Sequence, residues 1–70
     1  MDVLMLPTAR AVHEIVTQQG EADHSQLAKA TNVSLTTVGR VAARLERAGL
    51  VTQTRVGRRV IVRSSTPLGT

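Results

Sequence analysis

The chain has 70 residues and a formal net charge of +4, and it contains no cysteine and no Phe, Tyr or Trp. A chain of this length holds one small core, and without cysteine it has no disulfide framework, thiolate zinc site or thiol nucleophile. The lack of aromatic side chains makes it a poor candidate for the single-strand binders that stack bases on aromatic platforms.

The charge is unevenly distributed along the chain. Residues 1–33 carry a balance of −2, whereas residues 34–70 carry seven arginines against Glu46 alone, a balance of +6. A basic half beside a mildly acidic half predicts one surface built for a polyanion. Arginine also suits bidentate contacts with phosphate and guanine.

The first predicted element is a helix over residues 8–19. Pro7 and Thr8 mark its start, and Gly20 stands where a C-terminal cap is expected. Apolar residues between them follow the 3.6-residue period and predict a core-facing stripe. These residues are Ala9, Val12, Ile15 and Val16.

A second, shorter helix is predicted to start at Asp23. Asp23 and Gln26 have the spacing of a capping box, in which the carboxylate and the amide each bind a backbone N–H. Glu21 and Ala22, before the helix, are predicted to be a connector. Asn32 suits a left-handed residue at the break that ends the helix.

The third helix is predicted to begin at Ser34, a good N-cap, and to close at Gly49. With successive residues 100° apart, one side of this helix is mainly apolar and the opposite side is small, polar and basic. The first side holds Ser34, Val38, Val41, Ala42 and Leu45. The opposite side holds Thr36, Arg40, Ala43 and Arg47, with Gly39 and Arg44 flanking it.

The last segment predicts a β-hairpin, because residues 50–56 and 59–63 are rich in β-branched side chains. Gly57 and Arg58 fit a two-residue type II′ loop. That loop puts Val51, Val60 and Val62 on one face, with Thr52, Thr54, Arg59, Ile61 and Arg63 on the other. We expect one domain over residues 1–63 and a flexible tail over residues 64–70.

No catalytic or metal site can be assembled from the sequence. There is no Ser-His-acid set, phosphate-binding loop or pair of carboxylates, so we expect neither an enzyme nor a cofactor. His13, Glu14, Asp23 and His24 invite a metal interpretation, but His13 and Glu14 point to different helix faces and Asp23 is better used as a cap. Residues 3–6 are too few for a signal peptide or membrane span, so we expect a cytoplasmic protein with no membrane partner.

The order of a helix, a short helix, a tight turn, a basic helix and a basic hairpin resembles a winged helix-turn-helix domain, an α+β fold with three helices and a two-stranded wing. The segments that carry the resemblance are residues 25–30, 32–34, 37–40 and 45–51. They are similar to the core of the MarR, ArsR and IclR groups of bacterial regulators. Residues 39–51 are also similar to the gamma domain of FtsK-like DNA translocases.

The resemblance implies that the helix from Ser34 is a recognition helix in the major groove and that the hairpin loop is the wing. Residue chemistry agrees, since short side chains allow close approach to the bases and Arg40 can reach guanine. The expected DNA-binding residues of the helix are Ser34, Thr36, Thr37, Gly39, Arg40, Ala43, Arg44 and Arg47. Those of the wing are Arg55, Arg58 and Arg59.

Together these features predict sequence-specific binding of double-stranded DNA, as a transcriptional regulator. The alternatives are a recognition domain of a translocase, or a winged helix reused as a protein-interaction module, which would have no need of the +6 balance.

MarR and ArsR proteins dimerise through additional helices, and IclR proteins carry a ligand domain. The sequence shows neither feature, so we expect a solitary module or a piece of a larger protein. We expect it to be monomeric when isolated, with no small-molecule ligand.

Overall fold

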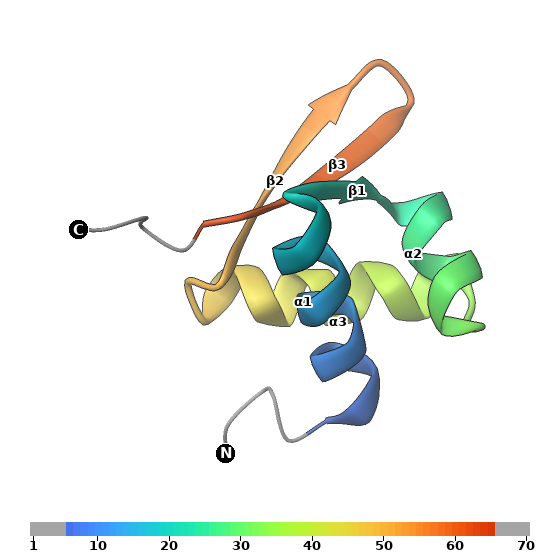
Figure 1. The fold of residues 1–70 in the computed structure, drawn as a ribbon. Helices are drawn as coiled ribbons and strands as arrows, with labels where there is room; N and C mark the ends of the chain where they lie inside the picture. Colours follow the sequence, from blue (N-terminus) through green and yellow to red (C-terminus); the bar gives the residue numbers. More distant parts are fainter. Residues whose placement is uncertain (1–5, 66–70) are drawn as a thin grey trace.

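The computed structural model describes residues 6–65 (Figure 1). Its elements in chain order are α1 (Pro7–Gln19), β1 (Glu21–Asp23), α2 (His24–Thr31), α3 (Leu35–Arg47), β2 (Val51–Val56) and β3 (Arg59–Ser64). The three helices pack together, and the hairpin of β2 and β3 projects from them. The predicted α+β winged helix-turn-helix fold is confirmed. Within the described residues, no helix has the length and apolar character needed to cross a membrane.

The sheet has three strands rather than the predicted two. Its order is β1-β3-β2, with both pairings antiparallel, and Ala22 of β1 lies opposite Val62 of β3. The prediction of a connector at Glu21 and Ala22 was therefore wrong. Three residues are too few to show an alternating pattern, and Glu and Asp are disfavoured in strands, so only the distant partner strand reveals β1.

The hairpin has the predicted loop. Val56 pairs with Arg59, which leaves Gly57 and Arg58 as a two-residue connection, and Gly57 has a φ of 62°. The predicted faces are confirmed, because Val51 and Val62 are buried on the face that packs against the helices.

Strand β3 continues to Ser64, and the Ser65 hydroxyl donates a 2.7 Å hydrogen bond to the carbonyl oxygen of Gly49. The folded unit thus includes two residues of the segment that was predicted to be a tail. Residues 66–70 lie outside the described residues.

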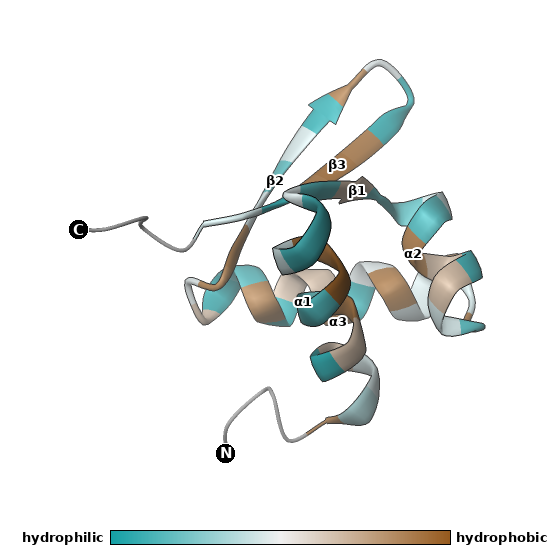
Figure 2. Ribbon diagram, in the orientation of Figure 1, coloured by the Kyte–Doolittle hydropathy of each residue, from teal (hydrophilic) through white to brown (hydrophobic). Residues whose placement is uncertain are grey.

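The core is built from small aliphatic side chains contributed by every helix and strand. The helical stripes predicted from the 3.6-residue period supply most of it, and α3 shows the clearest division into a brown apolar side and a teal polar side (Figure 2). The buried apolar residues are Ala9, Val12, Val16, Ala22, Leu27, Val38, Val41, Ala42, Leu45, Val51 and Val62. Ile15, also expected in the core, and Leu6 pack against it and are partly buried.

Local backbone signals fix the ends of the helices. Asp23 and Gln26 form the predicted capping box, and Asn32 adopts the left-handed conformation with a φ of 57°. The Ser34 hydroxyl accepts the N–H of Thr37 at 3.1 Å and caps α3. These caps set the angle between α2 and α3, and so fix which face of α3 is left in solvent.

Candidate nucleic-acid interface

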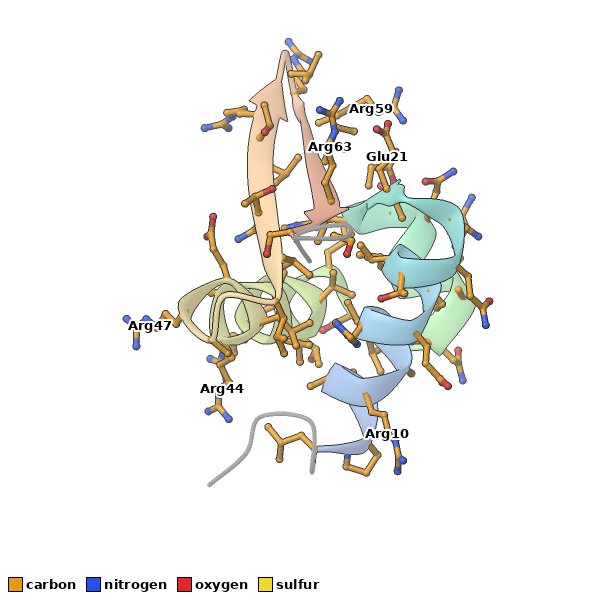
Figure 3. All side chains as sticks on the ribbon, turned by 60° about the vertical axis from the view of Figure 1, so that its left-hand side comes forward. Arg10, Glu21, Arg44, Arg47, Arg59 and Arg63 are labelled. Carbon is orange, nitrogen blue, oxygen red and sulfur yellow. The ribbon has the colours of Figure 1, made fainter. Side chains whose placement is uncertain are left out.

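Helix α3 presents a continuous exposed stripe because its opposite side is buried. Of the eight predicted residues on this helix, six are exposed and two, Thr37 and Gly39, are half-buried. The exposed six are Ser34, Thr36, Arg40, Ala43, Arg44 and Arg47. Arg44 and Arg47 extend away from the molecule at the C-terminal half of the helix (Figure 3).

Ser34 departs from its predicted position on the buried side. It is exposed, because it precedes the first turn and its hydroxyl is used as the cap. The Ser34 and Thr37 hydroxyl oxygens are also 3.0 Å apart, so each holds the other in place. This pair presents oriented hydroxyls at the start of the exposed stripe.

Gly39 lies in the middle of α3 without any need imposed by the fold. A Cβ atom added at this position would meet no heavy atom within 4 Å, and its φ is not positive. Glycine in a helix lowers the stability by about 1 kcal/mol relative to alanine. The packing within residues 6–65 does not explain why glycine is present here. Close approach to an external surface would explain it.

The three predicted wing arginines are all exposed, but they are not equivalent. Arg59 donates from Nε to Asp23 Oδ2 at 3.1 Å and adds a second bond from its terminal nitrogen to the same oxygen. The side chains of Arg55 and Arg58 make no hydrogen bond or ion pair within residues 6–65. Only these two therefore offer an uncompensated charge at the wing.

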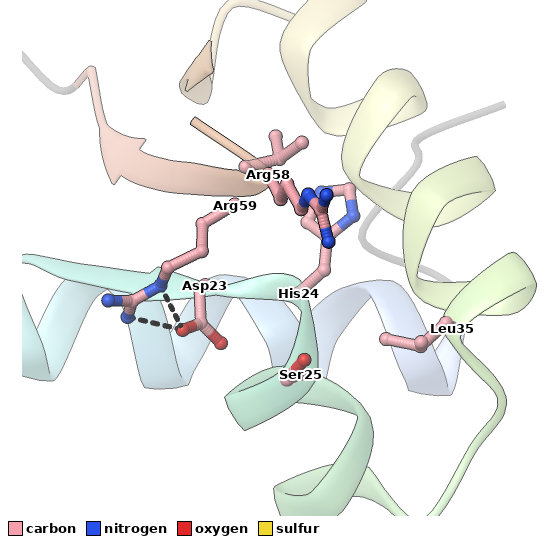
Figure 4. A pocket seen from close by; sticks show the side chains of 7 residues that line it. Asp23, His24, Ser25, Leu35, Arg58 and Arg59 are labelled. Carbon is pink, nitrogen blue, oxygen red and sulfur yellow. Dashed lines mark hydrogen bonds and ion pairs between the residues drawn. The ribbon is translucent and has the colours of Figure 1, made fainter. Parts of the chain in front are cut away.

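Asp23 joins the helix-turn-helix unit to the wing (Figure 4). Its side chain is nearly buried, with 8% of the residue exposed. The backbone N–H of Gln26, at 2.7 Å, lowers the pKa of this carboxyl below its ordinary value, and the Arg59 guanidinium lowers it further. The sequence indicated the cap, but the ion pair joins residues too far apart in the chain for spacing to reveal it.

A second polar connection runs through Gln53 at the base of the wing. His24 Nε2 and Gln53 Oε1 are 2.8 Å apart, so the tautomer protonated on Nε2 donates to the amide. Gln53 in turn donates to Glu46 of α3 from its backbone N–H and from Nε2, each at 3.2 Å. These bonds link α2, β2 and α3, and sequence reasoning did not identify them.

Two of the four residues considered as metal ligands, Asp23 and His24, are used in these contacts. Asp23 binds Gln26 and Arg59, and the His24 ring binds Gln53. Among the residues that the structure describes, no group of three or more His, Cys, Asp or Glu side chains is arranged to hold a metal ion.

A pocket of about 220 Å³ separates the start of α2 and the start of α3 from the wing (Figure 4). Its lining residues are Asp23, His24, Ser25, Leu35, Arg58, Arg59 and Val60. Leu35 was not singled out from the sequence, although its position beside the core stripe of α3 was readable there. The pocket places the apolar side chain of Leu35 between the start of α3 and the wing.

Comparison with known proteins identifies the family of this chain. The sequence model of the MarR family matches residues 12–56, from the second turn of α1 to the end of β2. The chain belongs to the MarR family. No curated protein matches this MarR-family chain.

Solved structures agree with the family. A transcriptional regulator homologue from Pyrococcus horikoshii OT3 has a TM-score of 0.84 at 22% identity over 91% of this chain, and shows the fold. A possible transcriptional regulator for arsenical resistance has the same TM-score and coverage at 30% identity. PcaV, a transcriptional regulator from Streptomyces coelicolor solved with its natural ligand, has a TM-score of 0.77 at 25% identity over 87% of this chain.

This MarR-family chain spans 67%, 66% and 45% of those three proteins, respectively. The prediction of a winged-helix domain of the transcriptional-regulator type is confirmed by the family and by these neighbours. Nothing in the comparisons favours the translocase alternative.

Proposed function

We propose that this chain binds double-stranded DNA sequence-specifically and serves as the DNA-reading part of a cytoplasmic transcriptional regulator that is not an enzyme. Helix α3 would enter the major groove, and the loop between β2 and β3 would contact the backbone or the minor groove. The proposal covers only the length of chain that this sequence spans.

The observation that carries the proposal is the contrast between paired and unpaired arginines. Arg59 and Arg63 are held by Asp23 and Glu21, with 3.0 Å between Arg63 Nε and Glu21 Oε1. The side chains of the arginines of α3 and of the wing tip make no hydrogen bond or ion pair within residues 6–65. These unpaired residues are Arg40, Arg44, Arg47, Arg55 and Arg58. Unpaired guanidinium groups on two neighbouring elements form the positively charged surface that is expected of a protein that binds a polyanion.

The residues between the arginines support base reading rather than charge attraction alone. Thr36 and Ala43 are short and exposed, and Gly39 has no side chain, so α3 can approach the base edges closely. Arg40 lies among them with a side chain long enough to bond both acceptors of guanine. Arg44 and Arg47 lie toward the end of the helix, where contacts with phosphate are expected.

The number of copies on DNA is part of the proposal. One copy offers few contacts, so we infer micromolar binding to a single site and tighter binding when several copies occupy neighbouring sites. A multimeric parent protein would have the same effect.

The test is selection of binding sequences from a pool of random duplexes, followed by affinity measurements on the selected duplex and on a random duplex. Arg40→Ala is expected to cost about 1–3 kcal/mol on the selected duplex and much less on the random one. Arg10→Ala is the matched control, because Arg10 is an exposed arginine of α1 outside the interface (Figure 3). It should change neither affinity appreciably.

Two results would contradict the proposal. One is a pool in which no sequence is enriched, which would favour a protein-interaction role for the domain. The other is an equal loss from Arg40→Ala on both duplexes, which would remove α3 from its role in base reading.

A further inference from the structure

Two large apolar side chains stand out on the surface of residues 6–65, and each lies at the end of a DNA-facing element. Leu35 is 56% exposed at the first position of α3, and Val56 is 57% exposed beside the wing loop. Neither is needed by the core, which excludes both.

Leu35 lies in a mainly apolar hollow with the cationic side chains of Arg58 and Lys29 among the residues that line it. It points into the pocket that Ser25, His24 and Arg58 also line (Figure 4). On its other side it borders a shallow depression with Ser25, Ala28 and Lys29. The charges of Lys29 and Arg58 are unpaired within the described residues. An occupant of this position must therefore be anionic at its edges and offer an apolar group to Leu35.

Duplex DNA has this combination of properties. The 5-methyl of thymine is the one apolar group that bases display in the major groove, and it lies between two rows of phosphates. The residues at the start of a recognition helix are those that contact base edges in helix-turn-helix complexes. Leucine has no donor or acceptor, so it can read the methyl and nothing else on the base.

We propose that Leu35 is a specificity-determining residue that selects thymine by contact with its 5-methyl group. This inference rests on the proposed DNA-binding function and deepens it. It adds an apolar contact to the hydrogen-bonding contacts expected from Arg40, and so predicts a thymine within the target.

The experiment starts from the duplex that the wild-type chain selects from a random pool. Each thymine of this duplex is replaced singly by uracil, which removes one methyl group and leaves base pairing intact. At one position of the selected site, uracil is expected to weaken wild-type binding about fourfold, the factor that corresponds to burial of one methyl group. Leu35→Ala should bind the thymine and uracil duplexes equally.

Two variants serve as controls. Val56→Ala removes a side chain of equal exposure from the wing and should keep the fourfold preference for thymine over uracil. Leu35→Met restores a long apolar side chain and should also keep it. Because Leu35 is exposed, truncation is expected to leave folding intact, and thermal unfolding of each variant checks this point.

Three results would overturn the inference. The first is a thymine–uracil difference that persists unchanged in Leu35→Ala, and the second is a selected site at which no single uracil matters. The third is a loss of affinity in Leu35→Ala that is equal on the selected duplex and on a random duplex, since this would make Leu35 a general contact. Failure of the proposed function itself would appear differently, as the absence of any selected site.

Discussion

At the scale of single residues, two neighbouring arginines of the wing have different roles. Arg58 and Arg59 are adjacent and equally basic, and sequence reasoning assigned both to DNA. In the structure Arg59 is bonded to Asp23, whereas Arg58 is unpaired at the wing tip. An ion pair largely cancels the attraction that a guanidinium exerts on phosphate, so we assign Arg59 to holding the wing against α2.

The salt dependence of DNA binding tests this division. With five unpaired arginines at the interface, the slope of log K against log salt is expected to be about −4 to −5 per copy. Arg58→Ala should reduce its size by about one, and Arg59→Ala by clearly less. Equal reductions in the two variants would show that Arg59 leaves Asp23 to meet phosphate.

Gly39 offers a second test at this scale, because stability and binding should move in opposite directions. Gly39→Ala is expected to stabilise the fold by roughly 0.5–1 kcal/mol, since the helix accepts a Cβ at this point without a clash. The same methyl should weaken binding to the selected duplex if α3 approaches the bases here. Urea unfolding and binding titrations measure the two effects. Stabilisation without loss of affinity would leave Gly39 as a weak point of the helix only.

At the scale of elements, the sequence predicted what local chemistry determines. Periodicity located all three helices, and Asp23, Asn32 and Ser34 marked their ends correctly. Gly57 with Arg58 predicted the hairpin loop and hence the register. Sequence analysis did not predict strand β1, because β1 forms only by pairing with the distant strand β3. It missed the ion pair of Asp23 with Arg59 for the same reason, since these two residues are also far apart in the chain. Contacts between distant segments depend on how elements pack, which no short pattern records.

The contact of β1 and α2 with the wing makes stability depend on pH. The pKa of Asp23 is lowered in the folded state, so its contribution is present at neutral pH and is lost as the pH falls below about 4. Asp23→Asn removes the charge at every pH. The gap in urea midpoint between wild type and Asp23→Asn should therefore be largest near pH 7 and shrink toward pH 3.

Glu21→Gln is the control for this measurement. The ion pair of Glu21 with Arg63 is more than half exposed on both sides, so its loss should shift the midpoint little at any pH. A gap for Asp23→Asn that stays constant with pH would mean that the cap geometry, and not the charge, supplies the contribution.

At the scale of the whole molecule, the core is small and aliphatic. Cores of this size usually yield no more than about 3–5 kcal/mol of stability. Helix α1 buries Ala9, Val12 and Val16 in this core, and its other side carries exposed polar residues such as Arg10 and Glu14. No second apolar stripe is thus available on α1 for a partner subunit.

We therefore expect the isolated chain to be monomeric at micromolar concentration, and sedimentation equilibrium measures this directly. A stable dimer would reveal an interface that residues 6–65 do not display.

The position of β3 has a consequence for synthesis of the protein. This strand is the last element within residues 6–65, yet it lies in the middle of the sheet and places Val62 in the core. A nascent chain of which only the three helices have left the ribosome lacks strand β3. This strand joins β1 to β2 and carries Arg59, which binds Asp23. Helix α3 is therefore made before the sheet that completes the fold, and we expect a ribosome-bound chain to acquire its complete fold only after Ser64 has left the exit tunnel.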